Sequence, residues 1–188
     1  ENLPAGLGRE QQAIDLRIES RVVFSGYGRV AKWLDLAKEA GERAFAVSDD
    51  YRHLSATAVR AAALNFYGDA REAIAANSLA LAKAEALGDA AWLNYVEYAL
   101  GQAYFTAGHL NAADQMLERS YRRLSDPECR AIPGTTIADM RLLCCMMRCV
   151  CNVGRTEIDE AKRYRLEACG VAEERGRPFD RVAAGYCV

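Results

Sequence analysis

The feature that most constrains this chain is an internal repeat. Four glycines, Gly26, Gly68, Gly108 and Gly154, each follow an apolar helical stretch and precede an amphipathic one. Successive glycines are 42, 40 and 46 residues apart. A period of this length is typical of arrays of helix pairs, in which each pair buries its apolar face only against its neighbours. We therefore expect a stack of similar units.

Each glycine stands where one helix would end and the next would begin. Glycine has no Cβ and adopts positive φ at little cost, which the C-terminus of a helix needs for a sharp turn. We expect all four glycines to turn the chain in this way. The segment after Gly108 then places Ala113, Leu117, Ser120 and Leu124 at the three- and four-residue spacing of an amphipathic helix.

Apolar periodicity and turn signals together divide the chain. They predict helices near 9–25, 29–47, 52–67, 70–87, 90–107, 110–125, 135–153, 156–175 and 178–188. In pairs these give units over 9–47, 52–87, 90–125 and 135–175, followed by a truncated helix over 178–188. We assign residues 1–188 to a single helical repeat domain and expect it to be a fragment of a longer protein. The predicted fold is all-α, a right-handed superhelical solenoid of antiparallel helix pairs with about four and a half repeats.

Composition agrees with this fold and narrows the classes of partner. The sequence has 34 alanines, and alanine is the best helix former. Hydrophobic residues make up 51% and charged residues 27%, which is typical of a globular chain. The net charge of −2 lacks the basic footprint of a nucleic-acid binder, so we expect no nucleic-acid partner. No apolar run approaches the roughly 20 residues of a membrane helix, so we expect no membrane partner and a cytoplasmic location.

The cysteines do not form a secretory pattern. There are seven, an odd number without regular spacing, which favours reduced thiols in the cytoplasm. Cys144, Cys145, Cys149 and Cys151 fall on one predicted helix, where four thiolates cannot converge on a single metal ion. We interpret them as small buried apolar residues, with redox sensing and metal binding as the alternatives. We expect no cofactor.

Enzyme chemistry has no supporting constellation. The only two histidines, His53 and His109, have no nucleophile partner in sequence. The glycine-rich loops that bind phosphate in nucleotide enzymes are absent from the sequence. The acidic pair Asp49-Asp50 stands at a predicted helix start, where carboxylates serve as caps. We therefore expect the chain itself not to be an enzyme.

The third unit carries a family resemblance. Leu100-Gly101, Tyr104, Gly108, Ala113 and Leu117 have the spacing of the tetratricopeptide repeat, which this unit resembles. The resemblance implies that small residues let the first and second helices of a unit (helix A and helix B) approach closely. It also implies a concave groove lined by the A helices.

A narrower resemblance covers residues 13–124. It rests on the segments Ala13–Arg17, Gly26–Arg29, Ala84–Asp89 and Leu100–Tyr104. These resemble the C-terminal repeat region of bacterial multidomain proteins that carry a class III adenylate cyclase domain and an ATPase domain. The likeness implies a non-catalytic regulatory arm of a signalling protein. Related arrays in ATPase-type transcriptional regulators leave a peptide or small-ligand sensor as the alternative.

One helical stripe is the best candidate for a binding site. If Gly108 is the tetratricopeptide turn, the groove-lining positions are Tyr95, Tyr98, Gln102 and Phe105, with Asn65 in the second unit and Arg141 and Arg148 in the fourth. Aromatic anchors flanked by arginine suit a bound peptide or helix. Alternatively, the aromatic side chains pack between repeats and the arginines are solvated.

The expected partner is a protein or peptide, which includes other domains of the parent chain. A second copy of the chain is an additional candidate. It would pair through the exposed face of the terminal repeat, which includes Val182, Ala183 and Tyr186.

Overall fold

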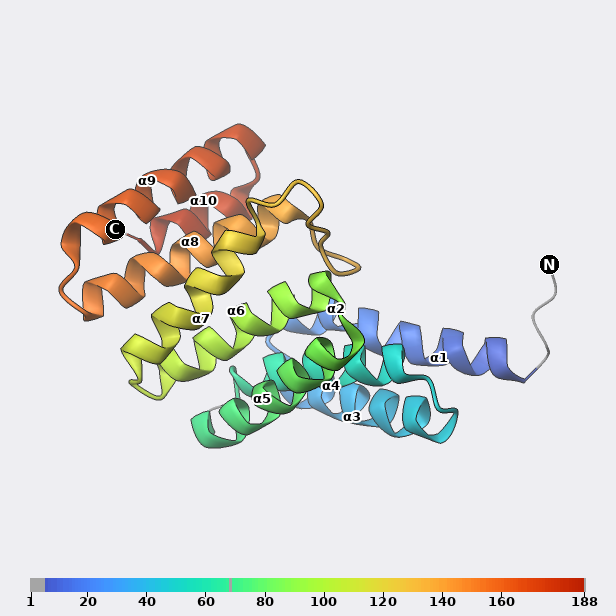
Figure 1. The fold of residues 1–188 in the computed structure, drawn as a ribbon. Coiled ribbons are helices and arrows are strands. Elements are labelled where there is room, and N and C mark those ends of the chain that lie inside the picture. Colours follow the sequence, from blue (N-terminus) through green and yellow to red (C-terminus); the bar gives the residue numbers. More distant parts are fainter. Residues whose placement is uncertain (1–5, 68, 188) are drawn as a thin grey trace.

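All regular structure in the described part of the chain is helical. The computed structural model describes residues 6–67 and 69–187, and within these ranges it contains ten helices and no strand (Figure 1). In chain order they are α1 (Leu7–Glu19), α2 (Arg21–Gly26), α3 (Val30–Ala46), α4 (Asp50–Leu64), α5 (Ala70–Leu87), α6 (Ala90–Thr106), α7 (Leu110–Arg123), α8 (Ile137–Gly154), α9 (Ile158–Arg175) and α10 (Pro178–Gly185). The predicted all-α class is confirmed.

Side-chain caps explain why the predicted helix starts are close to the observed ones. Asp49, Asp69 and Asp89 each precede a helix and accept hydrogen bonds from backbone N–H groups of its first turn. Thr136 and Asp139 form a reciprocal capping box at the start of α8. Each cap satisfies N–H groups that have no partner within the helix, so the start of the helix is encoded locally.

The first predicted helix, over 9–25, is wrong as one continuous element. The chain breaks at Ser20, between α1 and α2. The Ser20 hydroxyl donates to the carbonyl of Arg17 at 2.6 Å, a local bond of the kind that competes with regular helix geometry. The break turns Arg21 towards a distant part of the chain, where its guanidinium donates to the carbonyl of Pro133.

The expectation for the repeat glycines is correct at only one of the three described positions. Gly108 has φ of 78°, as a turn glycine should. Gly26 is helical, and Gly28 takes the positive φ in its place. Gly154 is the last residue of α8, and Thr156 takes the positive φ. Gly68 lies outside the described residues.

Position 154 requires a glycine for packing and not for its φ. A Cβ at this position would lie 3.1 Å from Cδ1 of Leu110. The missing side chain therefore lets the end of α8 approach the start of α7, and the neighbouring residues form the turn.

The helices pack in one repeating pattern, with consecutive helices running in opposite directions (Figure 1). We call α1, α4, α6, α8 and α10 the A helices and α3, α5, α7 and α9 the B helices. Each A helix contacts the next A helix, and each B helix contacts the A helices before and after it. The described part of the chain is thus a row of helix pairs, in which each pair is joined to the next mainly by its B helix packing on the next A helix.

The two central A helices are buried on nearly every face. In α4 a run of four residues, Ala61 to Leu64, is buried, and in α6 every residue from Val96 to Gly101 is buried. The B helices bury only a narrow stripe, as α5 does with Ala73, Asn77, Ala80 and Ala84. A helix that is surrounded in this way needs small side chains wherever a neighbour comes close.

Gly101 marks the closest of these approaches. A Cβ built on Gly101 would lie 2.7 Å from Cγ of Leu117 and 3.3 Å from the carbonyl oxygen of Ala113, both on α7. Any side chain at this position would therefore push α6 and α7 apart.

We expect Gly101→Ala to lower the free energy of unfolding by about 1–3 kcal/mol, because the added methyl group overpacks the α6–α7 contact. The matched control is Gly170→Ala on α9, where a Cβ would meet nothing within 4 Å. That change should raise the free energy of unfolding by about 1 kcal/mol through helix propensity alone. Urea unfolding followed by circular dichroism measures both values. Equal effects of the two substitutions would contradict a steric role for Gly101.

The last helix is held by a network of charges. Asp139, in the first turn of α8, pairs with Arg175 at 2.6 Å and with Arg177. Asp180 on α10 is fully buried and pairs with Arg175 at 3.0 Å and Arg177 at 2.8 Å. Burial alone would raise the pKa of Asp139, but hydrogen bonds from Thr136, Arg177 and Arg175 outweigh it and hold the pKa well below its ordinary value.

This depressed pKa predicts a pH-dependent contribution to stability. Above the unfolded-state pKa of about 3.9, Asp139 is ionised in both states and its contribution is complete. As the pH falls below that value the unfolded chain binds the proton first, so the contribution shrinks until the folded group is protonated too. Asp139→Asn should therefore destabilise the protein at pH 7, and the difference from wild type should shrink as the pH falls below about 3.9.

Thermal unfolding between pH 7 and pH 3 measures this difference. Asp159→Asn is the control, because the Asp159 side chain is fully exposed and has a single pairing with Lys162 at 3.5 Å. It should change the melting temperature little at any pH. A deficit of Asp139→Asn that stays constant with pH would contradict the assignment.

Candidate functional site

The predicted stripe lies on the face of α6 between α4 and α8. Asn65, directly after α4, donates from Nδ2 to the carbonyl of Ala99 at 2.8 Å. On the other side, Tyr98 belongs to the same apolar cluster as Cys144 and Met147 of α8. The stripe therefore lies among the neighbouring A helices. Its four residues differ in how accessible they are to a partner.

One end of the stripe is accessible. Asn65, Gln102 and Phe105 are half-buried, and Nδ2 of Asn65 lies 3.4 Å from Oε1 of Gln102. Asn65 is held from a second side, because Nδ2 of Asn77 donates to its Oδ1 at 3.2 Å. Its amide is thus fixed in orientation beside two partly exposed side chains, one polar and one aromatic.

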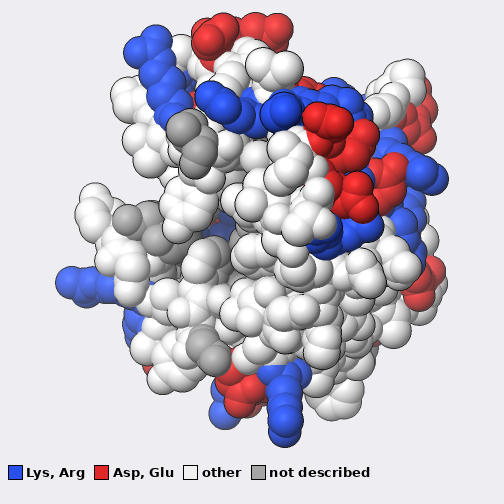
Figure 2. Space-filling model, turned by 90° about the vertical axis from the view of Figure 1, so that its left-hand side faces the viewer, with Lys and Arg blue, Asp and Glu red and all other residues white. Residues whose placement is uncertain are grey.

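The same end continues into an edge rich in exposed apolar residues. The turns that join A helices to B helices lie along the side shown in Figure 2, where a hollow is visible and much of the lower surface carries neither acidic nor basic groups. The exposed large apolar residues in or beside these turns are Tyr27, Phe66, Tyr67 and Val153. Apolar surface of this kind is typical of contact sites.

The middle of the stripe is not accessible. Tyr98 is only 6% exposed, and it packs with Leu117, Met140 and Met147. Burial raises the pKa of its hydroxyl above the ordinary range. Tyr98 therefore serves as core between the third and fourth units.

Tyr95 lies at the other end, beside Arg21. Burial raises the pKa of Tyr95, and the positive charge of Arg21 partly offsets this rise. Arg21 is itself only 5% exposed. Tyr95 thus packs both against the Tyr98 cluster and against the core of the first units, beside the α1–α2 break.

Arg141 and Arg148 do not join the stripe. Arg141 pairs with Glu167 of α9 at 3.0 Å, and it also donates to the carbonyl of Leu124. Their positions on α8 are roughly a quarter turn away from the face that contacts Tyr98. The structure therefore separates the two arginines from the aromatic residues that were grouped with them.

Arg148 is the centre of a buried ion network. It is 5% exposed and pairs with Asp114 and Glu118 of α7. Its guanidinium carbon also lies 4.3 Å from the ring centroid of Tyr164 and 5.7 Å from that of Tyr121. Both acids and both rings satisfy the charge within the protein, so Arg148 acts between helices α7, α8 and α9.

Sequence reasoning missed one segment that reaches this face. The chain from 124 to 136, which we call the α7–α8 loop, folds back so that Ile132 is only 2% exposed (Figure 1). Ile132 belongs to the apolar cluster that contains residues of α1, α3, α4, α5 and α6. Pro133-Gly134 is a recognisable turn signal in the sequence, but it gives no information on where the turn packs.

The four cysteines of α8 are buried. Burial raises the pKa of Cys144 to about 12. The thiols of Cys144 and Cys151 donate to the carbonyls of Leu117 and Leu110 on α7, each at 3.3 Å. The interpretation as small buried residues is confirmed for their packing, and in the described residues no three His, Cys, Asp or Glu side chains are grouped to hold a metal ion.

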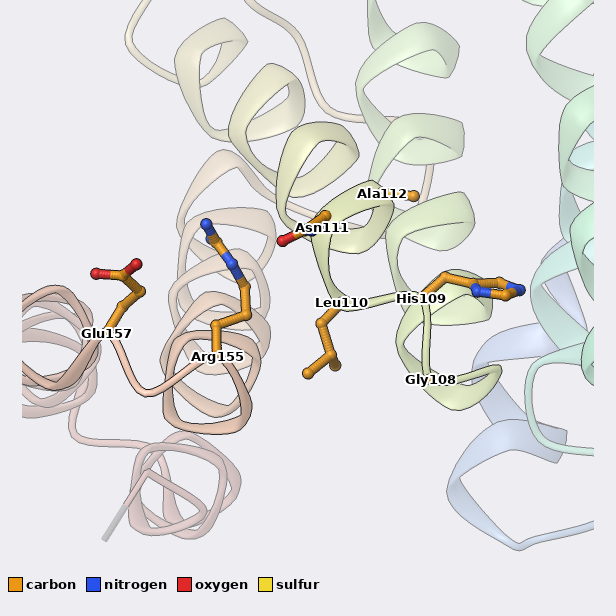
Figure 3. Close-up of a pocket in the computed structure, with 7 residues that line it drawn as sticks. All are labelled: Gly108, His109, Leu110, Asn111, Ala112, Arg155 and Glu157. Atoms are coloured by element: carbon orange, nitrogen blue, oxygen red, sulfur yellow. The ribbon is translucent and has the colours of Figure 1, made fainter.

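A depression lies at the turns before α7 and α9, and Figure 3 shows the residues that line it. They are Gly108, His109, Leu110, Asn111, Ala112, Arg155 and Glu157. His109 points away from Arg155 and Glu157, and Arg155 is already paired with Asp114 at 2.5 Å. The lining side chains therefore do not converge on a common point where a reaction could occur.

The comparisons do not place the chain in a family. No protein-family model matches it, and no curated protein matches it either. Across residues 6–67 and 69–187, no helix combines the length and apolar character that crossing a bilayer requires.

Because Tyr98 is buried, its replacement tests packing of the core and not binding. Tyr98→Ala should lower the free energy of unfolding by about 3–5 kcal/mol, because it leaves a cavity between α6 and α8. Tyr186→Ala is the matched control, since Tyr186 is 75% exposed, and its effect should stay within about 0.5 kcal/mol. Chemical unfolding measures both values, and a neutral Tyr98→Ala would contradict the assignment to the core.

Proposed function

We propose that this chain is a non-catalytic interaction module whose A helices present a binding face to a segment of a partner protein. In this proposal the helix pairs form a right-handed, tetratricopeptide-like solenoid over residues 1–188. Two observations support it. The contacts alternate regularly between A and B helices, and the central A helices contain small residues at their close approaches.

The observation that carries the binding role is the accessible end of the stripe. Asn65, Gln102 and Phe105 combine an oriented amide with a partly exposed ring. This end adjoins the exposed aromatic residues Phe66 and Tyr67 in the α4–α5 turn. Asn65 uses both ends of its amide within the protein, so it positions Gln102. The Gln102 amide beside apolar and aromatic surface suits an extended or helical peptide.

The resemblance to cyclase- and ATPase-linked arrays supports a cytoplasmic bacterial signalling role, in which the partner segment is part of another domain of the parent protein. A small-ligand sensor would need free basic groups in the binding face. The observed pairing of Arg141 with Glu167 and of Arg148 with Asp114 favours the peptide-binding role instead.

A second copy of the chain is a further candidate partner. Val182 and Tyr186 on the outer side of α10 are 72% and 75% exposed, while Ala183 is buried against the preceding helices. This face would pair two copies end to end and leave the stripe available.

A random peptide library displayed on phage tests the proposal with the intact chain as bait. We expect enriched peptides to share apolar or aromatic anchors and to bind with micromolar affinity. Replacing both Asn65 and Phe105 with Ala should weaken binding about ten-fold or more, because hot-spot side chains of this kind each contribute at least 1–2 kcal/mol.

Leu166→Ala is the control, because Leu166 is 73% exposed on α9, a B helix. It should leave the affinity unchanged. Circular dichroism confirms that each variant is folded. The absence of enriched peptides, or binding that ignores the Asn65 and Phe105 changes, would overturn the proposal.

A further inference from the structure

The α7–α8 loop is longer than a connection between helix pairs requires. The other connections from a B helix to the next A helix run over 47–49, 88–89 and 176–177, whereas this one runs over 124–136. Long connections inside a compact domain are uncommon and usually serve a function. The extra residues reach the other half of the molecule.

Only a few groups attach the loop to the first two units. Ile132 is buried in the same cluster as Ile18, Ala62 and Val96. Arg21 donates to the Pro133 carbonyl across 112 residues of sequence. The flanking residues Ser125, Asp126 and Glu128 are exposed. These two contacts join the loop to the first two units. Elsewhere in the loop Leu124 packs with Met140, and Cys129 accepts from Nδ2 of Asn94 at 3.5 Å.

The bound turn has a defined local conformation. Thr135 N–H donates to the Ile132 carbonyl at 3.1 Å, and Gly134 has φ of 73°. These values and the Pro-Gly sequence define a type II turn, which sets its own geometry before it docks. A Cβ on Gly134 would lie 2.9 Å from Oε2 of Glu19. The Glu19 carboxylate is at the end of a flexible side chain and can move aside, so the positive φ of Gly134 is what favours glycine at this place.

We infer that the loop is a built-in ligand of the A-helix face, and that the same site binds, from a partner, an extended segment with a branched aliphatic residue followed by a Pro-Gly turn. This site lies at the Arg21 and Tyr95 end of the stripe, apart from Asn65 and Phe105, so the inference goes beyond the proposed function. Ile132 shows the apolar anchor that the site takes, and Arg21 supplies the donor for a carbonyl next to it. The partner segment binds when the loop leaves.

The probe is a fluorescein-labelled peptide with the sequence of residues 128–137, in which Cys129→Ser prevents oxidation. The full chain with Ile132→Asp is the opened form, because a carboxylate is expelled from an apolar cluster. We expect the peptide to bind this variant about ten-fold or more tightly than it binds wild type, since the tethered loop occupies the wild-type site at a high effective concentration. Fluorescence anisotropy measures the affinities.

Three controls make the result specific. Ser125→Asp adds the same charge at an exposed position of the same loop, and it should behave as wild type. The peptide with Ile132→Asp should bind no form of the protein. Arg21→Ala, added to the opened form, should weaken binding of the unchanged peptide several-fold.

Gly134→Val provides an opened form without a new charge, because a β-branched residue disfavours the φ of 73° on which the turn depends. Hydrogen exchange at residues 132–135 should become faster in both opened forms, while α4 and α6 stay protected. Equal binding of the peptide to wild type and to the opened forms, or no binding to folded opened forms, overturns the inference. Unfolding of both variants also overturns it, because the loop would then be an essential part of the core.

The two binding experiments together distinguish failure of this inference from failure of the proposed function. Library peptides that depend on Asn65 and Phe105, together with a loop peptide that binds nothing, would contradict only the inference. Loss of both kinds of binding would contradict both.

Discussion

The close approach of neighbours to the two central A helices is the constraint on which the remaining structure depends. α4 and α6 are covered on most of their faces, so their closest contacts are made across small side chains or none. Gly101 meets Leu117 where even a methyl group would not fit, and Ala80 and Ala84 bring α5 to the same core. The alanine-rich composition is therefore a packing requirement as much as a helix preference. Because most of α6 is surrounded, a partner can reach it mainly at its ends, whereas α4 also leaves Thr57 and Arg60 partly exposed along its middle.

In the C-terminal half the closely packed helices use different side chains at their contacts. Cysteine takes the place of alanine on α8, and weak thiol donors reach carbonyls of α7. Arg148, buried between two acids and two tyrosine rings, joins three helices, whereas interhelical ion pairs of the first units, such as Arg52 with Asp15, are partly exposed. Such a network specifies one arrangement of helices, because a shifted register would leave a buried charge without its partner. The C-terminal half thus buries a charged network, and the first half buries mainly small apolar side chains.

Local signals account for what the sequence predicts well. Aspartate caps and apolar periodicity are properties of short segments, and they place α5 and α6 within a residue or two of their observed bounds. The stripe on α6 is correctly given as one face, since its spacing is set by helix geometry. Its division into an accessible end at Phe105, a buried centre at Tyr98 and an end beside Arg21 depends on neighbours that are far apart in sequence. The partners of Arg141 and Arg148 cannot be predicted from the sequence either. A solvated arginine and a buried arginine can occupy the same position in a helical pattern.

The α7–α8 loop shows how a repeat array can regulate its own binding face without any catalytic group. In an array with short connections the A helices of neighbouring units meet directly. No segment of the chain can then cover or uncover the binding face that these helices share. A long connection changes this, because a tethered segment competes with free partners through its effective concentration rather than through high affinity. In this proposal the contacts that Ile132 and Arg21 make are exchanged for the same contacts with a partner segment. Arg21 can donate to the Pro133 carbonyl because the helix breaks at Ser20. The break in the first unit and the long loop after the third unit therefore serve the same regulation of the binding face.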